Sequence, residues 1–328
     1  MGDQIRLPTM KVAQYRFILE PLERMLLPPN AGSTLRGGFG YALKRLVCYR
    51  SGAKCAECGM GNDCVYGYLM RTSPPEDSDV LSALTSVARP FVFQPPLEQV
   101  DLCLPGEELR FRIVLVGRGI AYLPYFVLAF QQLGDVGLGS HRARFRLQEV
   151  TALGLTENAT VFDDIGGSIR ETNVNIGAET LEQEAAKLSE DRISVAFLTP
   201  ARLKHHGQYV RRGPPFHVLV RRLLDRVSSL SYFHCDERWE IDFRGWVERA
   251  KQVEAVDIAT RWADWERYSG RQDQRIKMGG LVGPVAYVGD VAPFRALLAL
   301  GTLVHVGKGT VMGNGRFAVK GLDTDLCS

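Results

Sequence analysis

The chain has 328 residues, of which 45% are hydrophobic and 23% are charged, and its formal net charge is +3. This composition is that of an ordinary soluble globular protein, long enough for two domains. The sequence contains no run of about 18 apolar residues, and its first residues lack the apolar core of a signal peptide. We therefore expect a cytoplasmic protein with no membrane partner, in which the cysteines stay reduced.

Six elements are predicted in the first half of the chain. Residues 11–20 form a strand, and residues 33–50 form a helix with Leu35, Phe39, Leu43 and Leu46 on one face. Strands at 89–94 and 108–117 precede a helix at 124–134 and a strand at 142–150. The order β-α-β-β-α-β predicts a ferredoxin-like domain, in which two helices cover one face of a four-stranded antiparallel sheet.

The second half repeats this order. A strand at 193–198 is followed by a helix whose apolar positions are Phe216, Val220, Leu223, Val227 and Leu230. On that helix, Arg221, Arg222 and Arg226 lie away from the apolar stripe. Residues 258–265 and 281–288 form a predicted hairpin, and a helix at 293–301 and a strand from residue 316 complete the copy. We predict an α+β protein of tandem ferredoxin-like (RRM-like) domains at 1–154 and 191–328, with an acidic solvated connection at 155–190.

Charge is unevenly distributed along the chain. Residues 155–190 contain eight acidic and two basic side chains, whereas residues 202–226 contain seven basic side chains and Asp225. A locally basic face is the electrostatic signature of phosphate binding, although a solvated helix and loop would have the same composition. The arginines expected to contact phosphate in this segment are Arg211, Arg212, Arg221 and Arg222.

A glycine-rich segment follows the last predicted helix. Five glycines lie between residues 301 and 315, interleaved with His305 and Lys308, and Arg316 follows them. Glycine permits positive φ and close approach of a ligand to the backbone amides, so this segment can wrap a polyanion. The spacing is not that of a mononucleotide or dinucleotide loop, which favours nucleic acid. The contacts are expected from Gly307, Gly309, Gly313, Gly315 and Arg316, and from the corresponding residues of the first copy, His141, Arg142 and Arg144.

These motifs resemble those of a known family. The runs Arg267-Tyr268-Ser269-Gly-Arg271, Met278-Gly-Gly-Leu281-Val-Gly283 and His305 to Phe317 resemble the C-terminal region of CRISPR-associated endoribonucleases that process precursor CRISPR RNA, within the RAMP superfamily. The run Leu35-Arg36-Gly37-Gly38-Phe39-Gly40, followed by a group of cysteines, resembles one branch of that family. The resemblance implies metal-independent cleavage of repeat RNA by the ribose 2′-hydroxyl, which leaves a cyclic phosphate and a 5′-hydroxyl and yields guide RNA. Ser269 and Arg271 are expected to reach phosphate.

The catalytic residues are predicted from this chemistry. His305, beside Lys308, is the expected general acid or base, although a histidine at that place also fits a structural role bonded to a backbone carbonyl. Many family members place a catalytic histidine after the first helix, but this chain has no histidine before His141. Tyr41 and Lys44 remain on that helix and are expected to assist. Slow cleavage that depends mainly on positioning, and RNA binding without cleavage, stay open.

Four cysteines form a separate group within residues 48–64. Cys48, Cys55, Cys58 and Cys64 are spaced Cys-x6-Cys-x2-Cys-x5-Cys. Four thiolates this close in sequence predict a structural metal site that would order a short polar loop, with zinc ahead of an iron–sulfur cluster, and free thiols are the alternative. No cofactor is expected for catalysis itself. The main hypothesis is thus a repeat-cutting endoribonuclease whose partners are repeat RNA and other CRISPR effector subunits, and the alternative is a non-catalytic RNA-binding RAMP subunit of an effector complex.

Overall fold

The computed structural model describes residues 4–50, 54–55, 57–74, 87–269 and 274–322. Contacts between Cα atoms divide the chain into two compact units. The first, called the N-terminal unit, comprises Lys11–Ile176 and Ser229–Asp236. The second, called the C-terminal unit, comprises Met1–Met10, Gly177–Ser228 and Glu237–Ser328. Within the described part of the chain, no helix combines the length and the apolar character needed to cross a bilayer.

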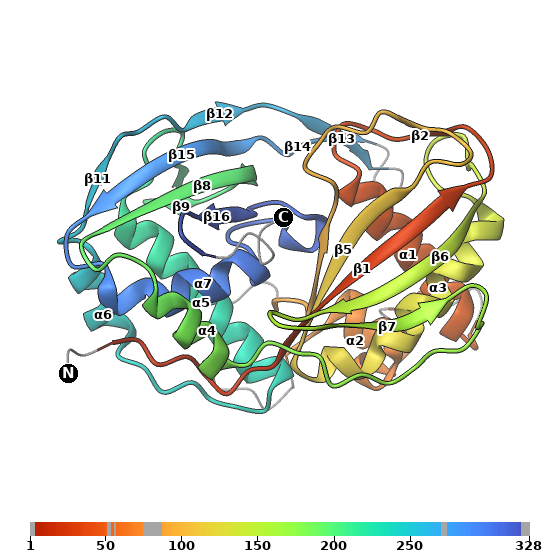
Figure 1. Cartoon of the computed structure of the whole chain (residues 1–328), viewed down its shortest axis with the longest axis horizontal. Helices are drawn as coiled ribbons and strands as arrows, with labels where there is room; N and C mark the ends of the chain where they lie inside the picture. The colour runs from red at the N-terminus through yellow and green to blue at the C-terminus, as the bar shows by residue number, and fades with distance from the viewer. Residues whose placement is uncertain (1–3, 51–53, 56, 75–86, 270–273, 323–328) are drawn as a thin grey trace. The chain divides into compact units, whose positions relative to one another are not determined.

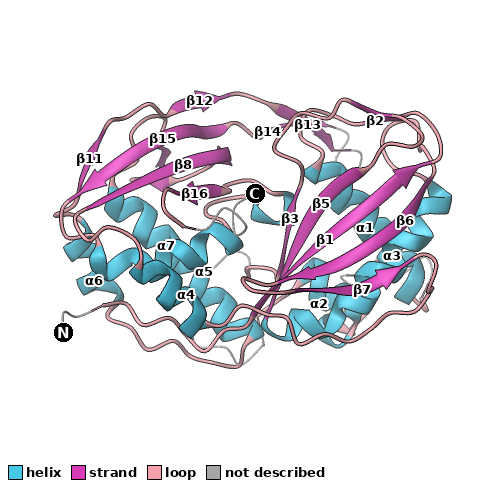
Figure 2. Ribbon diagram, viewed as in Figure 1, coloured by secondary structure: helices cyan, strands magenta, loops and turns pink. Residues whose placement is uncertain are grey.

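The N-terminal unit is built on a five-stranded antiparallel sheet in the order β3-β5-β1-β6-β7. Helices α1 and α3 pack against each other on one face of the sheet (Figures 1 and 2). Four of the strands and both helices have the order and pairing of a ferredoxin-like fold, as predicted, and β7 extends the sheet beside β6. The elements of this unit are β1 (Val12–Pro21), β2 (Met25–Leu26), α1 (Gly32–Val47), α2 (Val65–Arg71), β3 (Phe91–Gln94), β4 (Leu102–Cys103), β5 (Leu109–Val116), α3 (Leu123–Val136), β6 (Phe145–Leu153) and β7 (Asn158–Asp163).

Phenylalanine rings fill the space between this sheet and its helices. Phe39 of α1 stacks on Phe126 of α3 with ring centroids 4.2 Å apart, and it also contacts Phe93 of β3 at 5.7 Å. Leu35 and Leu43, one turn away on either side, are fully buried. The apolar face predicted for α1 is therefore confirmed at these three positions. Leu46 is an exception, since this residue near the end of the helix is 38% exposed to solvent.

The C-terminal unit repeats the arrangement. Its main sheet has the order β11-β15-β8-β16, with β12 also paired to β15, and all of these pairings are antiparallel. The chain order β8, α5, β11 and β12, β15, α7, β16 confirms the second ferredoxin-like copy. The elements are α4 (Ala178–Ala186), β8 (Arg192–Ala201), β9 (Lys204–His205), β10 (Gln208–Tyr209), α5 (Phe216–His234), α6 (Phe243–Ala250), β11 (Glu254–Val256), β12 (Arg261–Ala263), β13 (Glu266–Ser269), β14 (Gln274–Lys277), β15 (Gly280–Val288), α7 (Arg295–Val304) and β16 (Phe317–Val319).

The acidic segment 155–190 contains more structure than a solvated connection. Strand β7 lies within it and pairs with β6 from Leu153 to Glu149. Helix α4 also lies within it and packs on α7, where Arg295 Nη1 donates a hydrogen bond to the Leu188 carbonyl at 2.7 Å. Strand β7 pairs within the N-terminal unit and helix α4 packs within the C-terminal unit. Residues up to 176 therefore belong to the N-terminal unit, and residues from 177 belong to the C-terminal unit.

Candidate nucleic-acid interface

Helices α1 and α2 enclose a cavity of about 490 Å³ in the N-terminal unit. Two glycines of α1 explain the close packing around it. A Cβ on Gly40 would lie 2.3 Å from Met70 Cε of α2, and a Cβ on Gly38 would lie 2.7 Å from a methyl group of Leu133 in α3. The run of glycines in the first helix therefore lets two other helices approach α1 closely. The residues that line the cavity are Arg36, Gly37, Gly40, Tyr41, Lys44, Arg45, Cys48, Tyr66 and Met70.

The lining of this cavity, which we call the α1 pocket, is cationic and aromatic. It contains three basic side chains, Arg36, Lys44 and Arg45, and two tyrosines, Tyr41 and Tyr66. Among the described residues that line it, none is acidic. The positive charge of the pocket is therefore not balanced by its own walls, which favours an anionic ligand.

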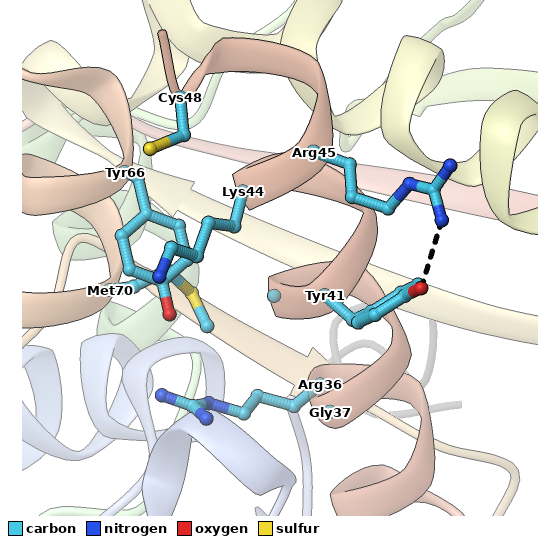
Figure 3. A pocket seen from close by; sticks show the side chains of 9 residues that line it. Arg36, Gly37, Tyr41, Lys44, Arg45, Cys48, Tyr66 and Met70 are labelled. Carbon is cyan, nitrogen blue, oxygen red and sulfur yellow. Dashed lines mark hydrogen bonds between the residues drawn. The ribbon is translucent and has the colours of Figure 1, made fainter. Parts of the chain in front are cut away.

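Two pairs of side chains define the geometry of the α1 pocket. Arg45 Nη1 donates a hydrogen bond of 2.9 Å to the Tyr41 hydroxyl oxygen, and Tyr41 is 50% exposed. Lys44 Nζ lies 6.0 Å from the centroid of the Tyr66 ring. Figure 3 shows Lys44 extending toward Tyr66 and Met70, whereas the bonded pair of Arg45 and Tyr41 lies to the other side of α1. Since Arg45 occupies a lone pair of the Tyr41 oxygen, the hydroxyl proton remains available to a ligand.

A smaller cavity of about 230 Å³ adjoins the same helix. Gly37 and Tyr41 line both cavities, and Arg142, from the loop after α3, lines the smaller one. The structure thus brings together Tyr41 and Arg142, which the sequence analysis placed in separate groups. Of the other residues predicted in that loop, His141 is exposed, and Arg144 forms an ion pair of 2.8 Å with Glu23.

The glycine-rich segment of the C-terminal unit is a compact turn. Gly307, Gly309, Gly313 and Gly315 all have positive φ, between 70° and 86°. Gly315 has no room for a side chain, because a Cβ there would lie 1.8 Å from the Val306 carbonyl oxygen. Only the first part of the turn faces solvent: Lys308 is exposed, whereas the stretch from Gly313 to Arg316 is buried.

His305 and Arg316 correct the sequence prediction. Both residues are buried, since His305 is 0% exposed and Arg316 is 3% exposed to solvent. His305 Nδ1 bonds to the Asn314 carbonyl at 3.2 Å. Burial and the nearby guanidinium groups of Arg316 and Arg226 hold the pKa of His305 well below its ordinary value. Both residues therefore shape the glycine-rich turn from inside, and neither is placed to contact RNA in this structure.

The remaining histidines fall into two kinds. His234 is buried at the end of α5, where its Nδ1 lies 2.9 Å from the Tyr68 hydroxyl and its Nε2 bonds to the Ala88 carbonyl at 2.7 Å. The rings of His205 and His206 are 4.0 Å apart, and His205 lies 5.3 Å from His217 of α5. The pKa values of His205 and His217 are lowered, first by desolvation and then by the positive charges around them.

The predicted basic segment is only partly free for phosphate. Arg211, Arg212 and Arg221 are exposed, whereas Arg222 pairs with Asp225 at 3.0 Å and donates to the Lys204 carbonyl at 2.8 Å. Arg226 differs from its predicted solvent-facing position: its Nε donates to the Val304 carbonyl at 2.5 Å, and burial lowers its pKa to about 9.

The two further predicted contacts are Ser269 and Arg271. Ser269 is the last residue of β13, where its backbone pairs with Gln274. Arg271 lies outside the described residues.

The zinc site expected from the cysteines is not supported. Among the residues that the structure describes, no group of three or more His, Cys, Asp or Glu side chains is arranged to hold a metal ion. All four cysteines belong to the described part of the chain, and each is a partly exposed free thiol. Cys48 instead ends α1 and lines the α1 pocket, with its Sγ 3.5 Å from the Arg50 carbonyl oxygen. The spacing of the four cysteines in sequence permits a metal site, but the described residues do not bring three of these thiols together around one centre.

Comparison with known proteins agrees with this fold. A family model described as CRISPR-associated endoribonuclease Cas6 matches residues 195–317, and a second family model, described as an N-terminal domain, matches residues 8–174. The chain belongs to the Cas6-like family of CRISPR-associated proteins. An uncharacterized protein of Archaeoglobus fulgidus is 26% identical over 306 residues, which cover 90% of this chain and 93% of that protein.

Solved structures share the tandem ferredoxin-like fold. A Cas6 product complex has a TM-score of 0.57 at 16% identity and covers 94% of this chain and 99% of the other. Thermus thermophilus Cas6 has a TM-score of 0.53 at 16% identity, with 94% and 98% covered. A partial Cas6-RT-Cas1–Cas2 complex has a TM-score of 0.59 at 12% identity and covers 96% of this chain but 47% of the other.

Three of the basic and aromatic side chains of the α1 pocket were not predicted from the sequence: Arg36, Arg45 and Tyr66. The first two follow from helical spacing, because positions 36, 37, 40, 41, 44 and 45 lie along adjoining rows of an α-helix. Tyr66 had no such signal, since α2 is a short helix within the cysteine-containing segment.

Proposed function

We propose that this Cas6-like protein binds CRISPR repeat RNA and cuts it in the precursor transcript, without a metal ion, by attack of a ribose 2′-hydroxyl on the adjacent phosphate. The observation that carries the proposal is the α1 pocket, where Arg36, Lys44 and Arg45 accompany two tyrosines and no acidic side chain is present among the described lining residues. RNA supplies both the negative charge that this lining attracts and the nucleophile. The Cas6 family match supports the same substrate class.

The pocket residues suit distinct roles in this reaction. Lys44 and Arg36 would hold the scissile phosphate and stabilise the added negative charge of the phosphorane. As the bond from the 2′-oxygen to phosphorus forms and the bond to the 5′-oxygen breaks, Tyr41 would donate its hydroxyl proton to the leaving 5′-oxygen. Arg45 would assist, because its hydrogen bond to the Tyr41 oxygen stabilises the tyrosinate that remains. Water would accept the 2′-hydroxyl proton, and solvent would then return a proton to Tyr41.

Cations of both units would hold the rest of the RNA. Arg142 lies beside Tyr41 in the smaller cavity, and Lys308 with Gly307 and Gly309 forms the exposed part of the glycine-rich turn. Arg211, Arg212 and Arg221 are exposed, and none of them forms an ion pair within the described part of the chain, so each would serve as a phosphate contact. Gly313 and Gly315 would act through the shape of the turn, since both are buried.

A non-catalytic RNA-binding role is the second candidate. No histidine lines the α1 pocket among the described residues, so the side chain best suited to proton transfer near neutral pH is missing from it. Some structural neighbours belong to larger assemblies, including the Cas6-RT-Cas1–Cas2 complex. In this alternative the protein would hold the RNA and join other CRISPR proteins through its tandem fold.

Cleavage of a labelled repeat RNA in EDTA tests the proposal. The expected result is a product with a 2′,3′-cyclic phosphate, formed at the same rate with and without chelator, and no product from RNA with a 2′-deoxy ribose at the cut. Tyr41→Phe should slow cleavage by about 100-fold with little change in affinity. The control is Tyr49→Phe, since Tyr49 is 71% exposed and lies outside the pocket lining. Tight binding without any cleavage would favour the non-catalytic candidate.

A further inference from the structure

A second group of cations and aromatic rings surrounds the β9–β10 hairpin of the C-terminal unit. The two strands pair His205 with Gln208 and Lys204 with Tyr209, so only two residues connect them. Both connecting residues have positive φ, 46° at His206 and 80° at Gly207. A two-residue loop with positive φ at both positions is a type I′ turn, whose twist matches that of the strands and fixes which side chains share a face.

The inner face of the hairpin packs on helix α5. Leu203 is fully buried, and the ring of His205 lies edge-on to His217 with centroids 5.3 Å apart. Arg222 of α5 donates a hydrogen bond of 2.8 Å to the Lys204 carbonyl, which anchors the hairpin backbone. Because side chains alternate along a strand, residues 202 and 204, and Tyr209 opposite Lys204, are left on the other face.

That other face carries a continuous series of cations and rings. Arg202 Cζ lies 4.6 Å and Lys204 Nζ lies 5.4 Å from the centroid of the Tyr209 ring. The Tyr209 ring lies 6.0 Å from Trp262 of β12, and Arg211 Cζ lies 4.8 Å from the Trp262 ring. Both rings are partly exposed.

The series is held in place by neighbouring groups. Trp262 Nε1 donates a hydrogen bond of 2.8 Å to Asp264 Oδ1. A Cβ on Gly279 would lie 2.9 Å from that indole nitrogen, so glycine there gives the ring room to lie against the backbone. Arg202 is anchored in turn by a hydrogen bond of 3.1 Å from its Nη1 to the Lys277 carbonyl. The rings and the guanidinium group are therefore set before any ligand arrives.

The charge on this face is not neutralised locally. Arg192 and Arg222 of the same unit each pair with an aspartate. In the part of the chain that the structure describes, no such ion pair involves Arg202, Lys204 or Arg211. Asp264 keeps its negative charge when its Oδ1 accepts the Trp262 hydrogen bond, but three cations against this one carboxylate leave the group positive.

We propose that Arg202, Lys204, Tyr209, Arg211 and Trp262, together called the hairpin platform, bind unpaired ribonucleotides, with bases stacked on the rings and guanidinium planes and phosphates held by the cations. Flat rings beside free cations are the recurring means of holding a single strand. A duplex does not fit this chemistry, because its base faces are already stacked on one another. The inference rests on the proposed function in that the repeat transcript supplies the strand, and it specifies that the segment held here is unpaired.

Binding of a short unstructured RNA tests the platform independently of cleavage. The probe is an eight-nucleotide oligouridine with one 2-aminopurine, titrated with the full chain. Trp262→Leu and Tyr209→Leu should each weaken binding by about tenfold, because a leucine keeps apolar volume but offers no flat face. The matched control is Trp239→Leu: Trp239 is also partly exposed in the C-terminal unit, but its Nε1 bonds to the Arg6 carbonyl and it lies outside the platform.

Charge is tested with the double variant Arg202→Gln/Arg211→Gln. The slope of log affinity against log salt concentration should fall by about 1.4, since each lost phosphate contact to a single strand removes about 0.7. Thermal unfolding of every variant shows which of them fold. Unchanged affinity of the folded Leu and Gln variants, or an equal loss in Trp239→Leu, would overturn the platform.

Repeat RNA separates this failure from a failure of the proposed function. If the protein cuts repeat RNA and the platform variants bind oligouridine as tightly as the wild type, then the proposed activity is present and the platform is absent. If the protein does not cut repeat RNA, but those variants lose oligouridine binding and the control does not, then the platform is present and the proposed activity is absent.

Discussion

The burial of His305 predicts that the protein loses stability as the pH falls below about 6.5. His305 is held neutral inside the fold, because burial and two guanidinium groups lower its pKa well below the ordinary value of 6.5. In the unfolded chain the same imidazole gains a proton as the pH passes that value. The unfolded state then binds more protons than the folded state, so the free energy of unfolding decreases with decreasing pH.

The size of this effect follows from one proton. For a histidine with an unfolded pKa near 6.5 that remains neutral when folded, the free energy of unfolding falls by about 2 kcal/mol between pH 7 and pH 5. His305→Asn removes the titrating group and keeps a donor for the Asn314 carbonyl. Histidine and asparagine both carry a Cβ, so the backbone strain at φ 62° and ψ 175° is present in both chains and does not depend on pH. The variant should therefore lose about 2 kcal/mol less than the wild type over this pH range.

Urea unfolding at pH 7, 6 and 5, followed by circular dichroism, measures the effect. The matched control is His141→Asn, because His141 is exposed. This control should keep the pH dependence of the wild type. Equal losses in the free energy of unfolding of His305→Asn and the wild type between pH 7 and pH 5 would show that His305 does not cause the pH dependence.

Three other predictions concern packing and charge. Gly315→Ala should lower the free energy of unfolding by about 2 kcal/mol or more, because the new Cβ would lie 1.8 Å from the Val306 carbonyl oxygen. The control Gly167→Ala, which has no atom within 4 Å of its new Cβ, should lower it by about 1 kcal/mol. Thermal unfolding of both variants measures the difference. Phe39→Ala should lower the free energy of unfolding in urea by about 3–5 kcal/mol, whereas Leu46→Ala should lower it by less than about 1 kcal/mol. Equal losses would show that Phe39 is not at the centre of the core. Lys44→Gln should reduce the salt slope of repeat RNA binding by about 0.7, while Lys187→Gln, which removes an exposed ion pair with Glu184, should leave the slope unchanged.

The fold could be predicted because its signals are local and periodic. The buried positions Leu35, Phe39 and Leu43 repeat with a helical period, and the same order of strands and helices occurs in both halves. The structure of residues 158–186 was not predicted, since its acidic composition masks the short apolar positions that β7 and α4 bury, such as Val161 and Leu181.

The site was harder to predict than the fold. Tyr41 and Lys44 were found through the family resemblance, and both line the α1 pocket. His305 was misjudged because its position next to glycines suggests an open loop, whereas the chain turns inward there and buries the ring. Burial of this kind depends on residues distant in sequence, such as Arg226, which the local pattern does not reveal.

The central claim is that the α1 pocket holds repeat RNA, and photo-cross-linking tests it most directly. Repeat RNA containing 4-thiouridine on either side of the cut would be irradiated with the intact protein, and the linked peptides would be identified by mass spectrometry. We expect cross-links within residues 36–48 and 65–71, which carry Tyr41, Tyr66 and the other lining residues. Efficient cross-links confined to other segments, with none to these two helices, would contradict it.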